Sequence, residues 1–296
     1  PDAAADGARE EHIMYVWLDA LPNSLTAVGY PDVGSDAFRT HWPASLHIVG
    51  KDILRFHAIY WPAFLLAAGL PLPTKLFAHG WWMVEGQKMS KSIGNVVDPF
   101  ALVEAYGADP VRYFMINEVS FGADGDFSDA KLVETVNAKL ANELGNLAYR
   151  TLSFTHKQCG GCVPEPAALT DDDRAMLAEA RAALPTLRGH VDALALHRSP
   201  QGRSRVASEA NRYVDVQAPW ALKKTDPVRM RTVLYVLLET LRHVAVLSQP
   251  VVPTIGKRLL EQLGLEPASC DFATLERPEH ALRAGATLPS PEIVVP

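Results

Sequence analysis

The spacing of apolar residues along the chain predicts two structural classes in succession. In the first part, short apolar runs predict strands over 12–18, 45–50 and 74–83, bounded by polar or Gly/Pro-rich segments. Between the last two strands, residues 53–68 repeat apolar side chains at helical spacing, and Asp52 is suited to cap that helix. A strand, a helix and a strand in succession predict a parallel sheet with crossover helices.

Further along, the pattern becomes entirely helical. Asp98-Pro99 is expected to open a short helix that Gly107 closes, and a second helix is predicted over 109–119. From about Ser128 onward only helical spacing is found. The helices predicted there cover 128–157, 170–188, 203–216, 219–224, 228–248 and 254–264. The chain is therefore expected to be an α/β portion followed by a helical bundle.

Composition and charge narrow the function only slightly. The 296 residues are 48% hydrophobic and 21% charged, which is ordinary for a globular protein of about two domains. A net charge of -6 argues against a general nucleic-acid coat, but a site-specific RNA binder depends on local Lys and Arg placement instead. Three cysteines do not form a disulfide framework, and no membrane-spanning run or signal pattern is found. These features predict a cytoplasmic protein that does not associate with membranes.

The segment Lys88-Met89-Ser90-Lys91-Ser92 carries the clearest chemical signal. It follows a predicted strand and precedes a capped helix. Two ammonium groups and two hydroxyls on a loop suit a polyphosphate whose negative charge rises in a transition state. A generic loop of this composition is more often a solvated basic loop. This particular five-residue string, however, has a chance occurrence on the order of 10⁻⁴ in such a chain at even residue usage.

The string resembles the lysine-serine signature loop of class I aminoacyl-tRNA synthetases. In that family the loop stabilises the pyrophosphate leaving group while the carboxylate of the amino acid attacks the α-phosphorus of ATP. The resemblance implies that Lys88 and Lys91 are catalytic, and that Ser90 and Ser92 shape the loop. The ATP-binding residues that it implies are Gly50, Lys51, Asp52, His79, Lys88, Met89, Ser90, Lys91 and Ser92.

Two further motifs indicate which amino acid is bound. Residues 15–20 (YVWLDA) look like the strand-to-helix corner of the methionyl-tRNA synthetase family, and residues 50–53 (GKDI), followed by Phe56-His57, look like its second pocket wall. An aromatic ring, small aliphatic groups and one imidazole form an apolar slot that suits a polarizable thioether. The methionine-binding residues implied by this resemblance are Trp17, Ala20, Leu21, Ile53 and His57.

Taken one at a time, these pocket residues also have structural explanations. Trp17 and Ile53 are of types that fill cores, and His57 is of a type that is often buried with its hydrogen bonds satisfied. The sequence also departs from the family at Ser24, where a tyrosine is usual. We therefore expect a pocket floor of different shape and assign no ligand contact to Ser24.

Two motifs in the helical part resemble the anticodon-reading residues of the same family. Asn146 and Arg150 share one helix face at i and i+4, and Gln217-Ala218-Pro219-Trp220 places an indole at a helix start. An amide and a guanidinium can read base edges, and an exposed indole can stack on an unpaired base. The resemblance implies that Asn146, Arg150 and Trp220 recognise a CAU anticodon. The alternatives are a surface residue, an ion pair and a core tryptophan, respectively.

The cysteine pair Cys159-Gly160-Gly161-Cys162 resembles half of a zinc knuckle. A structural zinc needs four ligands, and no second Cys/His pair of suitable spacing follows. We therefore expect a loop without metal and no metal bound by this chain. Any Mg²⁺ would arrive with ATP.

A class I synthetase also needs a motif of the His-Ile-Gly-His type, which this chain lacks, since residues 47–50 (HIVG) have no second histidine. We therefore expect a fragment that works with a missing N-terminal catalytic half and is inactive alone. The resemblance implies a Rossmann-like catalytic half followed by an all-α anticodon-binding bundle. The domains expected are 1–119 (catalytic half with the signature loop), 120–157 (stem-contact region and first long helix), 158–282 (anticodon-binding domain) and 283–296 (tail).

The function expected is that of a methionine-tRNA ligase, whose partners are methionine, ATP and tRNA(Met). One alternative is a class I synthetase for leucine, isoleucine, valine or cysteine. Another is a tRNA-binding relative without catalytic activity, although such a protein has no need for two lysines at a phosphate site.

Overall fold

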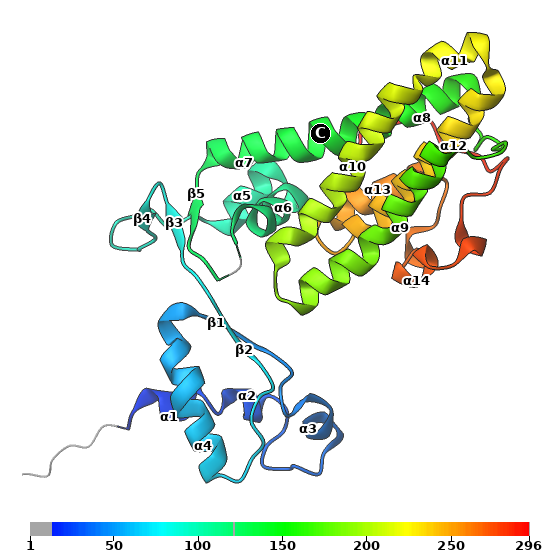
Figure 1. Cartoon of the computed structure of the whole chain (residues 1–296). Coiled ribbons are helices and arrows are strands. Elements are labelled where there is room, and N and C mark those ends of the chain that lie inside the picture. Colours follow the sequence, from blue (N-terminus) through cyan, green and yellow to red (C-terminus); the bar gives the residue numbers. More distant parts are fainter. Residues whose placement is uncertain (1–13, 121, 296) are drawn as a thin grey trace, which may run out of the picture. The chain divides into compact units, whose positions relative to one another are not determined.

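The computed structural model describes residues 14–120 and 122–295, and it divides into two compact units that meet between Trp81 and Trp82 (Figure 1). We call Pro1–Trp81 unit 1 and Trp82–Pro296 unit 2. Unit 1 has one hydrophobic core and unit 2 has two, and each unit is described separately below.

Unit 1 is built on two parallel strands, β1 (His47–Gly50) and β2 (Leu76–His79), in which Gly50 pairs with His79. A helical crossover joins them, as the apolar pattern of 45–83 predicts. Its parts are the 3-10 turn η1 (Lys51–Ile53), the π-helical turn η2 (Phe56–Tyr60) and α4 (Trp61–Ala67). The helices before β1 are α1 (Val16–Ala20), α2 (Asn23–Thr26) and α3 (Asp36–His41). The buried core consists of Leu21, Leu25, Phe38, Trp42, Trp61 and Leu65.

The strand predicted over 12–18 is wrong where the structure describes it, because the chain is helical from Val16. Residues 12 and 13 lie outside the described residues. A continuous apolar run has no period that separates strand from helix. Here the side chains of Val16 and Leu18 are 64% and 48% exposed, while Trp17 and Leu21, at i and i+4, pack inward. The buried positions therefore follow the period of a helix, although the residue composition of this segment favours a strand.

Two smaller expectations for unit 1 also need correction. Asp52 does not cap the crossover helix, since η1 already begins at Lys51 and has no side-chain cap. The strand predicted over 74–83 is two strands, β2 and β3 (Trp82–Val84), which belong to different sheets.

Unit 2 begins with a three-stranded sheet of order β4–β3–β5. The turn Glu85-Gly86, with positive φ at both residues, connects β3 to the antiparallel strand β4 (Gln87–Lys88), while β5 (Gly125–Phe127) runs parallel to β3. Between them lie α5 (Pro99–Tyr106) and α6 (Ala108–Glu118). Asp98 caps α5 by accepting a hydrogen bond from the Phe100 amide at 2.9 Å, and Gly107 ends it with φ 84°, as predicted.

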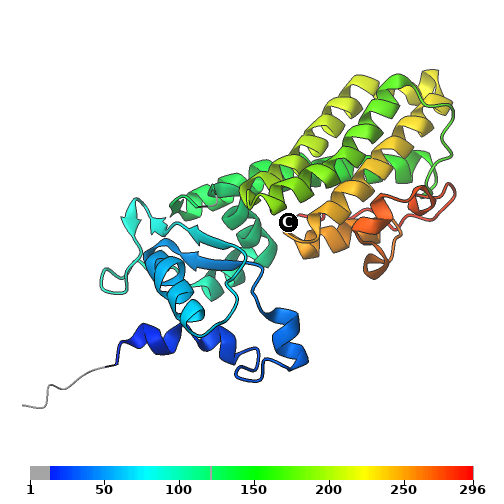
Figure 2. The same cartoon turned by 60° about the horizontal axis from the view of Figure 1, so that its bottom comes forward.

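The remainder of unit 2 is the helical bundle that the sequence predicts. A long helix begins with α7 (Asp129–Val136), passes through the π-helical segment η3 (Asn137–Gly145) and ends as α8 (Asn146–Gln158). The helices that follow are α9 (Asp171–Asp192), α10 (Ser199–Gln217), α11 (Pro219–Thr225), α12 (Pro227–Ser248) and α13 (Pro253–Gln262). They lie side by side in Figures 1 and 2. The four-residue helix α14 (Phe272–Leu275) was not predicted, because it is too short to show a period.

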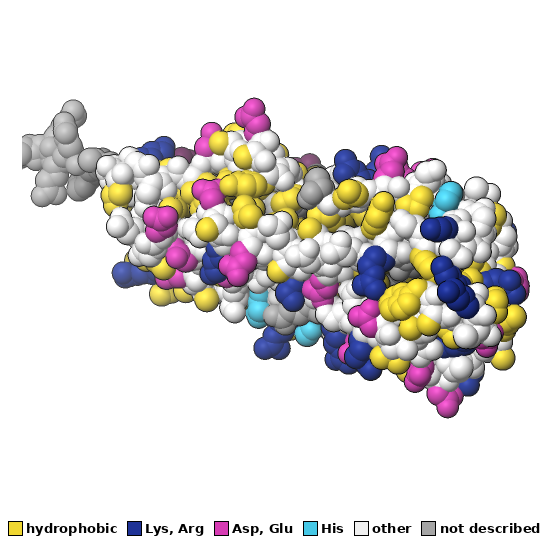
Figure 3. All heavy atoms as spheres, turned by 90° about the horizontal axis from the view of Figure 1, so that it is seen from above, with side chains coloured by type: hydrophobic (Ala, Val, Ile, Leu, Met, Phe, Trp, Pro, Cys, Tyr) yellow, Lys and Arg dark blue, Asp and Glu magenta, His cyan; other side chains and the backbone are white. Residues whose placement is uncertain are grey.

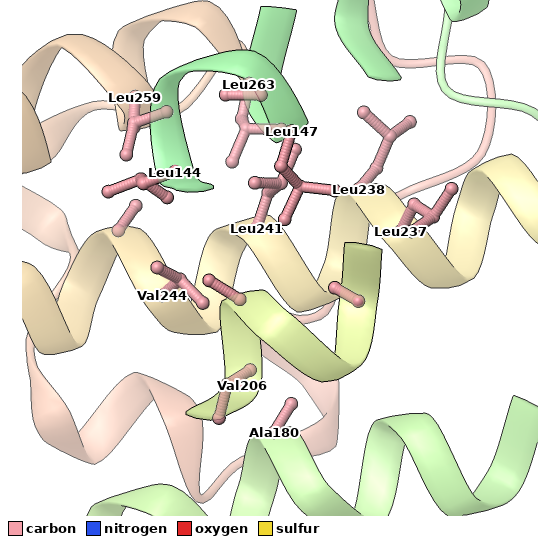
Figure 4. Close-up of a cluster of buried hydrophobic side chains, with 14 of the residues drawn as sticks. Leu144, Leu147, Ala180, Val206, Leu237, Leu238, Leu241, Val244, Leu259 and Leu263 are labelled. Carbon is pink, nitrogen blue, oxygen red and sulfur yellow. The ribbon is translucent and has the colours of Figure 1, made fainter. Parts of the chain in front are cut away.

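Helix α12 is the centre of the bundle. Its leucines and valines point toward Leu144 and Leu147 on one side and toward Val206 and Ala180 on the other (Figure 4). Almost every residue of α12 from Met230 to Ser248 is buried, which is why its sequence is apolar all round. No helix within the described residues is long and apolar enough to cross a membrane.

Candidate active site and nucleic-acid interface

The lysine-serine loop leaves β4 at Lys88 and is closed by one side chain, that of Asn95. The Asn95 Oδ1 atom accepts a hydrogen bond from the Ser90 amide at 2.8 Å, and Nδ2 donates to the Lys88 carbonyl at 3.3 Å. Inside this ring the Ser90 and Ser92 hydroxyls lie 2.7 Å apart. The Asn95 contact was missed from the sequence, although asparagine commonly bonds to nearby backbone in turns.

Both lysines of the loop are exposed, while Met89 and Ser90 are half-buried. The Ser90 and Ser92 hydroxyls hydrogen-bond to each other, and the Ser90 hydroxyl also accepts from the Ser92 amide at 3.3 Å. The arrangement places two exposed lysine residues on a constrained turn, and their positive charges suit a polyphosphate.

Four of the other residues expected to bind ATP come together at the carboxyl ends of β1 and β2. Gly50 and His79 are paired across the strands, and a side chain at Gly50 would come within 2.6 Å of the Asp52 Oδ1 atom. The His79 Nδ1 atom lies 2.8 Å from the Gly80 carbonyl, which fixes Nδ1 as the donor. The Lys51 ammonium lies 4.1 Å from the centroid of the Trp81 ring. The carboxyl edge of a parallel sheet is where such folds bind ligands.

Three of the residues expected to bind methionine also lie together in unit 1. The Trp17 ring stacks on Phe56 with centroids 4.1 Å apart and an interplanar angle of 11°, and it meets the edge of His57 at 6.2 Å. The His57 Nδ1 atom bonds to the Ile53 carbonyl at 3.0 Å. The contacts join the start of α1 to the crossover helix through aromatic rings, a surface that suits a thioether.

Two of the expected methionine-binding residues are placed differently. Leu21 is 4% exposed and belongs to the core of unit 1, whereas Ala20 is exposed. The Ser24 hydroxyl donates to the Leu21 carbonyl at 3.3 Å, so it is occupied within its own helical turn. Beside His57 lies His47, whose pKa is lowered by burial and by the positive charge of His57.

In unit 2, the Arg150 guanidinium carbon lies 5.6 Å from the centroid of the Trp220 ring, so α8 and α11 bring two of the predicted anticodon residues together. Arg150 also donates to Asp215 of α10 at 3.1 Å. The ion-pair alternative for Arg150 is thus present alongside the ring contact. Trp220 is 44% exposed, which excludes the alternative of a core tryptophan. Asn146 is exposed one turn before Arg150.

A groove of about 310 Å³ adjoins these side chains and is almost entirely apolar. Its lining residues come from α8, α10, α11 and α12, and they include Tyr149, Phe154, Pro219 and Trp220. In Figure 3, hydrophobic and Lys/Arg side chains lie next to each other at the end of the bundle around α11. Aromatic faces beside positive charges form a surface on which unpaired bases can stack.

A buried polar network holds the corner that presents Trp220. Ala218 adopts φ 41° between α10 and α11, and Gln217 before it accepts from Arg229 at 2.7 Å. Arg229 also donates to the fully buried carboxylate of Asp173 at 2.7 Å. Burial alone would raise the pKa of Asp173, but hydrogen bonds from Arg229 and Tyr213 outweigh it and hold the pKa below its usual value.

The cysteines of the segment 159–162 are both free thiols, and burial raises the pKa of Cys159. Within residues 14–120 and 122–295, no group of three or more His, Cys, Asp or Glu side chains is arranged to hold a metal ion.

Comparison with known proteins identifies the family. Residues 3–152 match the model of tRNA synthetases class I (M), and residues 163–295 match that of the anticodon binding domain of methionyl tRNA ligase. This chain belongs to the class I (M) tRNA synthetases. The lysine-serine loop and the Trp17–His57 cluster lie in the first match, and Trp220 lies in the second.

Individual relatives of this synthetase family cover nearly the whole chain. The chain is 52% identical over 288 residues to the methionine-tRNA ligase of Brucella suis biovar 1 (strain 1330), spanning 97% of this chain and 55% of that protein. It is 49% identical over 290 residues to that of Mycobacterium tuberculosis (strain ATCC 25618 / H37Rv). Among solved structures, Mycobacterium tuberculosis methionyl-tRNA synthetase in complex with methionyl-adenylate matches with a TM-score of 0.91 and 49% identity, over 96% of this chain and 56% of that one. The chain thus spans about half the length of these relatives.

Proposed function

We propose that the chain supplies the pyrophosphate-stabilising loop, the methionine pocket wall and the anticodon interface of a methionine-tRNA ligase. The observation that carries this proposal is the lysine-serine loop, closed by Asn95, with Lys88 and Lys91 exposed. Membership of the class I (M) family supports it.

The first chemical step is the activation of methionine. A carboxylate oxygen of methionine attacks the α-phosphorus of ATP, the bond to the bridging oxygen of the β-phosphate breaks, and pyrophosphate departs with its electron pair. Lys88 and Lys91 stabilise the charge that builds on pyrophosphate. ATP enters as its Mg²⁺ complex, so the metal belongs to the substrate. The strand-end residues Gly50, Lys51, Asp52 and His79 would hold the adenosine and phosphate groups, with Met89, Ser90 and Ser92 shaping the loop.

The specificity for methionine is assigned to the aromatic cluster of unit 1. Trp17 and His57 present a ring face and an imidazole, and Ile53 anchors His57 through its carbonyl. Ala20, which is exposed, and Leu21, which packs in the core of unit 1, complete the set of residues assigned to methionine.

In the second step a terminal hydroxyl of tRNA(Met) attacks the carbonyl carbon of methionyl-adenylate and releases AMP. For this reaction the tRNA has to be selected, and we assign that selection to the anticodon side chains. Trp220 would stack on a base of CAU, while Asn146 and Arg150 would read base edges.

The catalytic fold is proposed to be half of a Rossmann-like domain. Two parallel strands joined by a helical crossover support this, as does the 54% exposure of Ile48 on β1, because parallel strands are normally covered on both faces. We propose that the covering segment is the N-terminal catalytic half, and that the divisions 1–119, 120–157, 158–282 and 283–296 mark the working parts. A cytoplasmic location belongs to the same proposal, because charged tRNA is used there.

The test is amino-acid-dependent ATP–pyrophosphate exchange by the full-length protein with each of the twenty amino acids, followed by charging of tRNA(Met). We expect exchange with methionine only, and charging that depends on a CAU anticodon. Exchange with leucine, isoleucine, valine or cysteine instead would identify another class I synthetase. Binding of tRNA without any exchange would identify a non-catalytic relative.

A further inference from the structure

Helix α6 is shared by both cores of unit 2. Val111 and Phe114 pack with Phe127 and Leu132 in the core beside the small sheet, where Phe114 is completely buried. Tyr113, next to Phe114 in sequence, is 2% exposed and belongs to the core of the helical bundle. One face of α6 therefore packs on the segment that carries the lysine-serine loop, and another packs on the bundle.

The face toward the bundle begins with Asp109, which is 4% exposed. Its Oδ2 atom accepts a hydrogen bond from the Ile255 amide at 2.7 Å. Ile255 lies in the first turn of α13. The amide groups of a first helical turn have no hydrogen-bond partner within the helix. A carboxylate at this position both satisfies a donor and lies at the positive end of the helix dipole.

Arg112, three residues after Asp109, is positively charged and binds the segment between α12 and α13. Its Nε atom donates to the Val251 carbonyl at 2.9 Å, and one of its terminal nitrogens, Nη2, donates to the Pro250 carbonyl at 2.8 Å. These carbonyls lie two and three residues beyond Ser248, the last residue of α12, on the side of the helix where its dipole is negative. Residues at i and i+3 share a helix face, so Asp109 and Arg112 bind the α12–α13 corner together.

A small change of angle at the α12–α13 corner would move the anticodon side chains by a large distance, because they lie near the opposite end of α12. Trp220 lies on α11, just before α12 begins at Pro227, whereas Arg112 binds just beyond the other end of α12. At 1.5 Å per residue α12 is about 33 Å long, so a tilt of about 10° at the corner would displace its far end by roughly 6 Å. Acyl transfer needs the reacting atoms positioned to well within that distance.

We propose that Asp109 and Arg112 are positioning residues for aminoacylation. They hold the bundle at one angle on the segment that carries the lysine-serine loop, so that a tRNA bound at Trp220 brings its acceptor end to the adenylate. This inference rests on the proposed function. It assigns no role to either residue in activating methionine or in binding the anticodon.

The experiment separates three readouts in the full-length protein: methionine-dependent pyrophosphate exchange, affinity for a CAU anticodon stem-loop, and kcat for charging tRNA(Met). Arg112→Met removes both hydrogen bonds to the corner carbonyls and, because Arg112 is exposed, leaves the core intact. We expect the charging kcat to fall at least about tenfold, with exchange and stem-loop affinity within about twofold of wild type. Asp109→Asn, which keeps an oxygen for the Ile255 amide, should retain more charging activity than Asp109→Leu.

The matched control is Met115→Gln, which changes a side chain of α6 that is 48% exposed and should leave all three readouts unchanged. Charging by Arg112→Met within about twofold of wild type would overturn the proposal. The proposal would also be overturned if exchange or stem-loop affinity fell by the same factor as charging, since that would show a general structural role. If Arg112→Met does not fold, Arg112→Lys supplies the same comparison, because it retains the positive charge but replaces the two donor nitrogens, Nε and Nη2, by a single ammonium nitrogen. A wild-type protein that charges no tRNA(Met) would instead overturn the proposed function, and the positioning role with it.

Discussion

The Arg150 guanidinium carbon lies over the face of Trp220, 5.6 Å from the ring centroid, and its Nη2 atom pairs with the Asp215 Oδ1 atom at 3.1 Å. The three side chains come from α8, α11 and α10, so their meeting is a product of the bundle and not of any one motif. The indole keeps 44% of its surface exposed beside a largely apolar groove. We interpret this arrangement as a stacking surface for an anticodon base, oriented by an anchored cation.

Replacing Trp220 by alanine tests the stacking surface. Base–aromatic stacking contributes about 1–3 kcal/mol, so Trp220→Ala should weaken binding of a CAU stem-loop roughly 5- to 150-fold. Fluorescence anisotropy with labelled stem-loop RNA measures this change. Trp220→Phe keeps an aromatic face and should recover most of the affinity. Equal binding by wild type and Trp220→Ala would remove Trp220 from the interface.

Replacing Asn95 by alanine tests whether the shape of the lysine-serine loop matters. The substitution removes the two hydrogen bonds that join Ser90 and Lys88 across the loop, each worth on the order of 1 kcal/mol. We expect kcat/KM for pyrophosphate exchange to fall about tenfold or more, while the thermal unfolding midpoint hardly moves. Asn95→Asp, which still accepts from the Ser90 amide, should lose less. An unchanged exchange rate for Asn95→Ala would show that the loop needs no such closure.

Acid should weaken the polar network beneath the Trp220 corner. Because the pKa of Asp173 is held below its unfolded value, its carboxylate stabilises the fold above about pH 4, and this contribution is lost as the pH falls through the lowered pKa. Asp173→Asn should cost about 3–5 kcal/mol at pH 7, since it leaves the Arg229 charge without its buried partner. The difference between variant and wild type should shrink toward pH 3.

Urea unfolding followed by circular dichroism at pH 7 and pH 3 makes this comparison. Asp171→Asn is the matched control, because Asp171 begins the same helix and pairs with Arg174 while its side chain is 99% exposed. Such surface pairs contribute less than about 1 kcal/mol. An Asp173→Asn protein as stable as Asp171→Asn at pH 7 would show that the network is not needed for the corner.

Much of this fold could be predicted from the sequence, because a long helix repeats its apolar residues over many positions and one exception does not obscure the pattern. The bundle from Ser128 onward and the capped helix at Asp98 are both confirmed. The apolar run at 12–18 was misread as a strand, since only tertiary packing of Trp17 and Leu21 shows that the segment is helical. Secondary structure was thus most predictable where many residues share one pattern.

Candidate site residues can be proposed from the sequence where a motif is local, but not where distant residues meet. The lysine-serine string and the position of Trp220 could be read directly from the sequence. Asp215 and Arg229 could not, because Asp215 meets Arg150 from another helix and Arg229 meets Asp173 across 56 residues. The Asp109 and Arg112 contacts span even more of the chain, to Ile255 and Val251. No spacing rule predicts such pairs.

We propose that two ammonium groups of the lysine-serine loop stabilise departing pyrophosphate during methionine activation. The most direct measurement is methionine-dependent ATP–pyrophosphate exchange by the full-length protein carrying both Lys88→Ala and Lys91→Ala. Removing pre-organised charge from a developing anion typically costs about 10²–10³ in rate, so exchange should fall by at least that factor while stem-loop binding stays at the wild-type level. Exchange at the wild-type rate in this double variant would contradict the account.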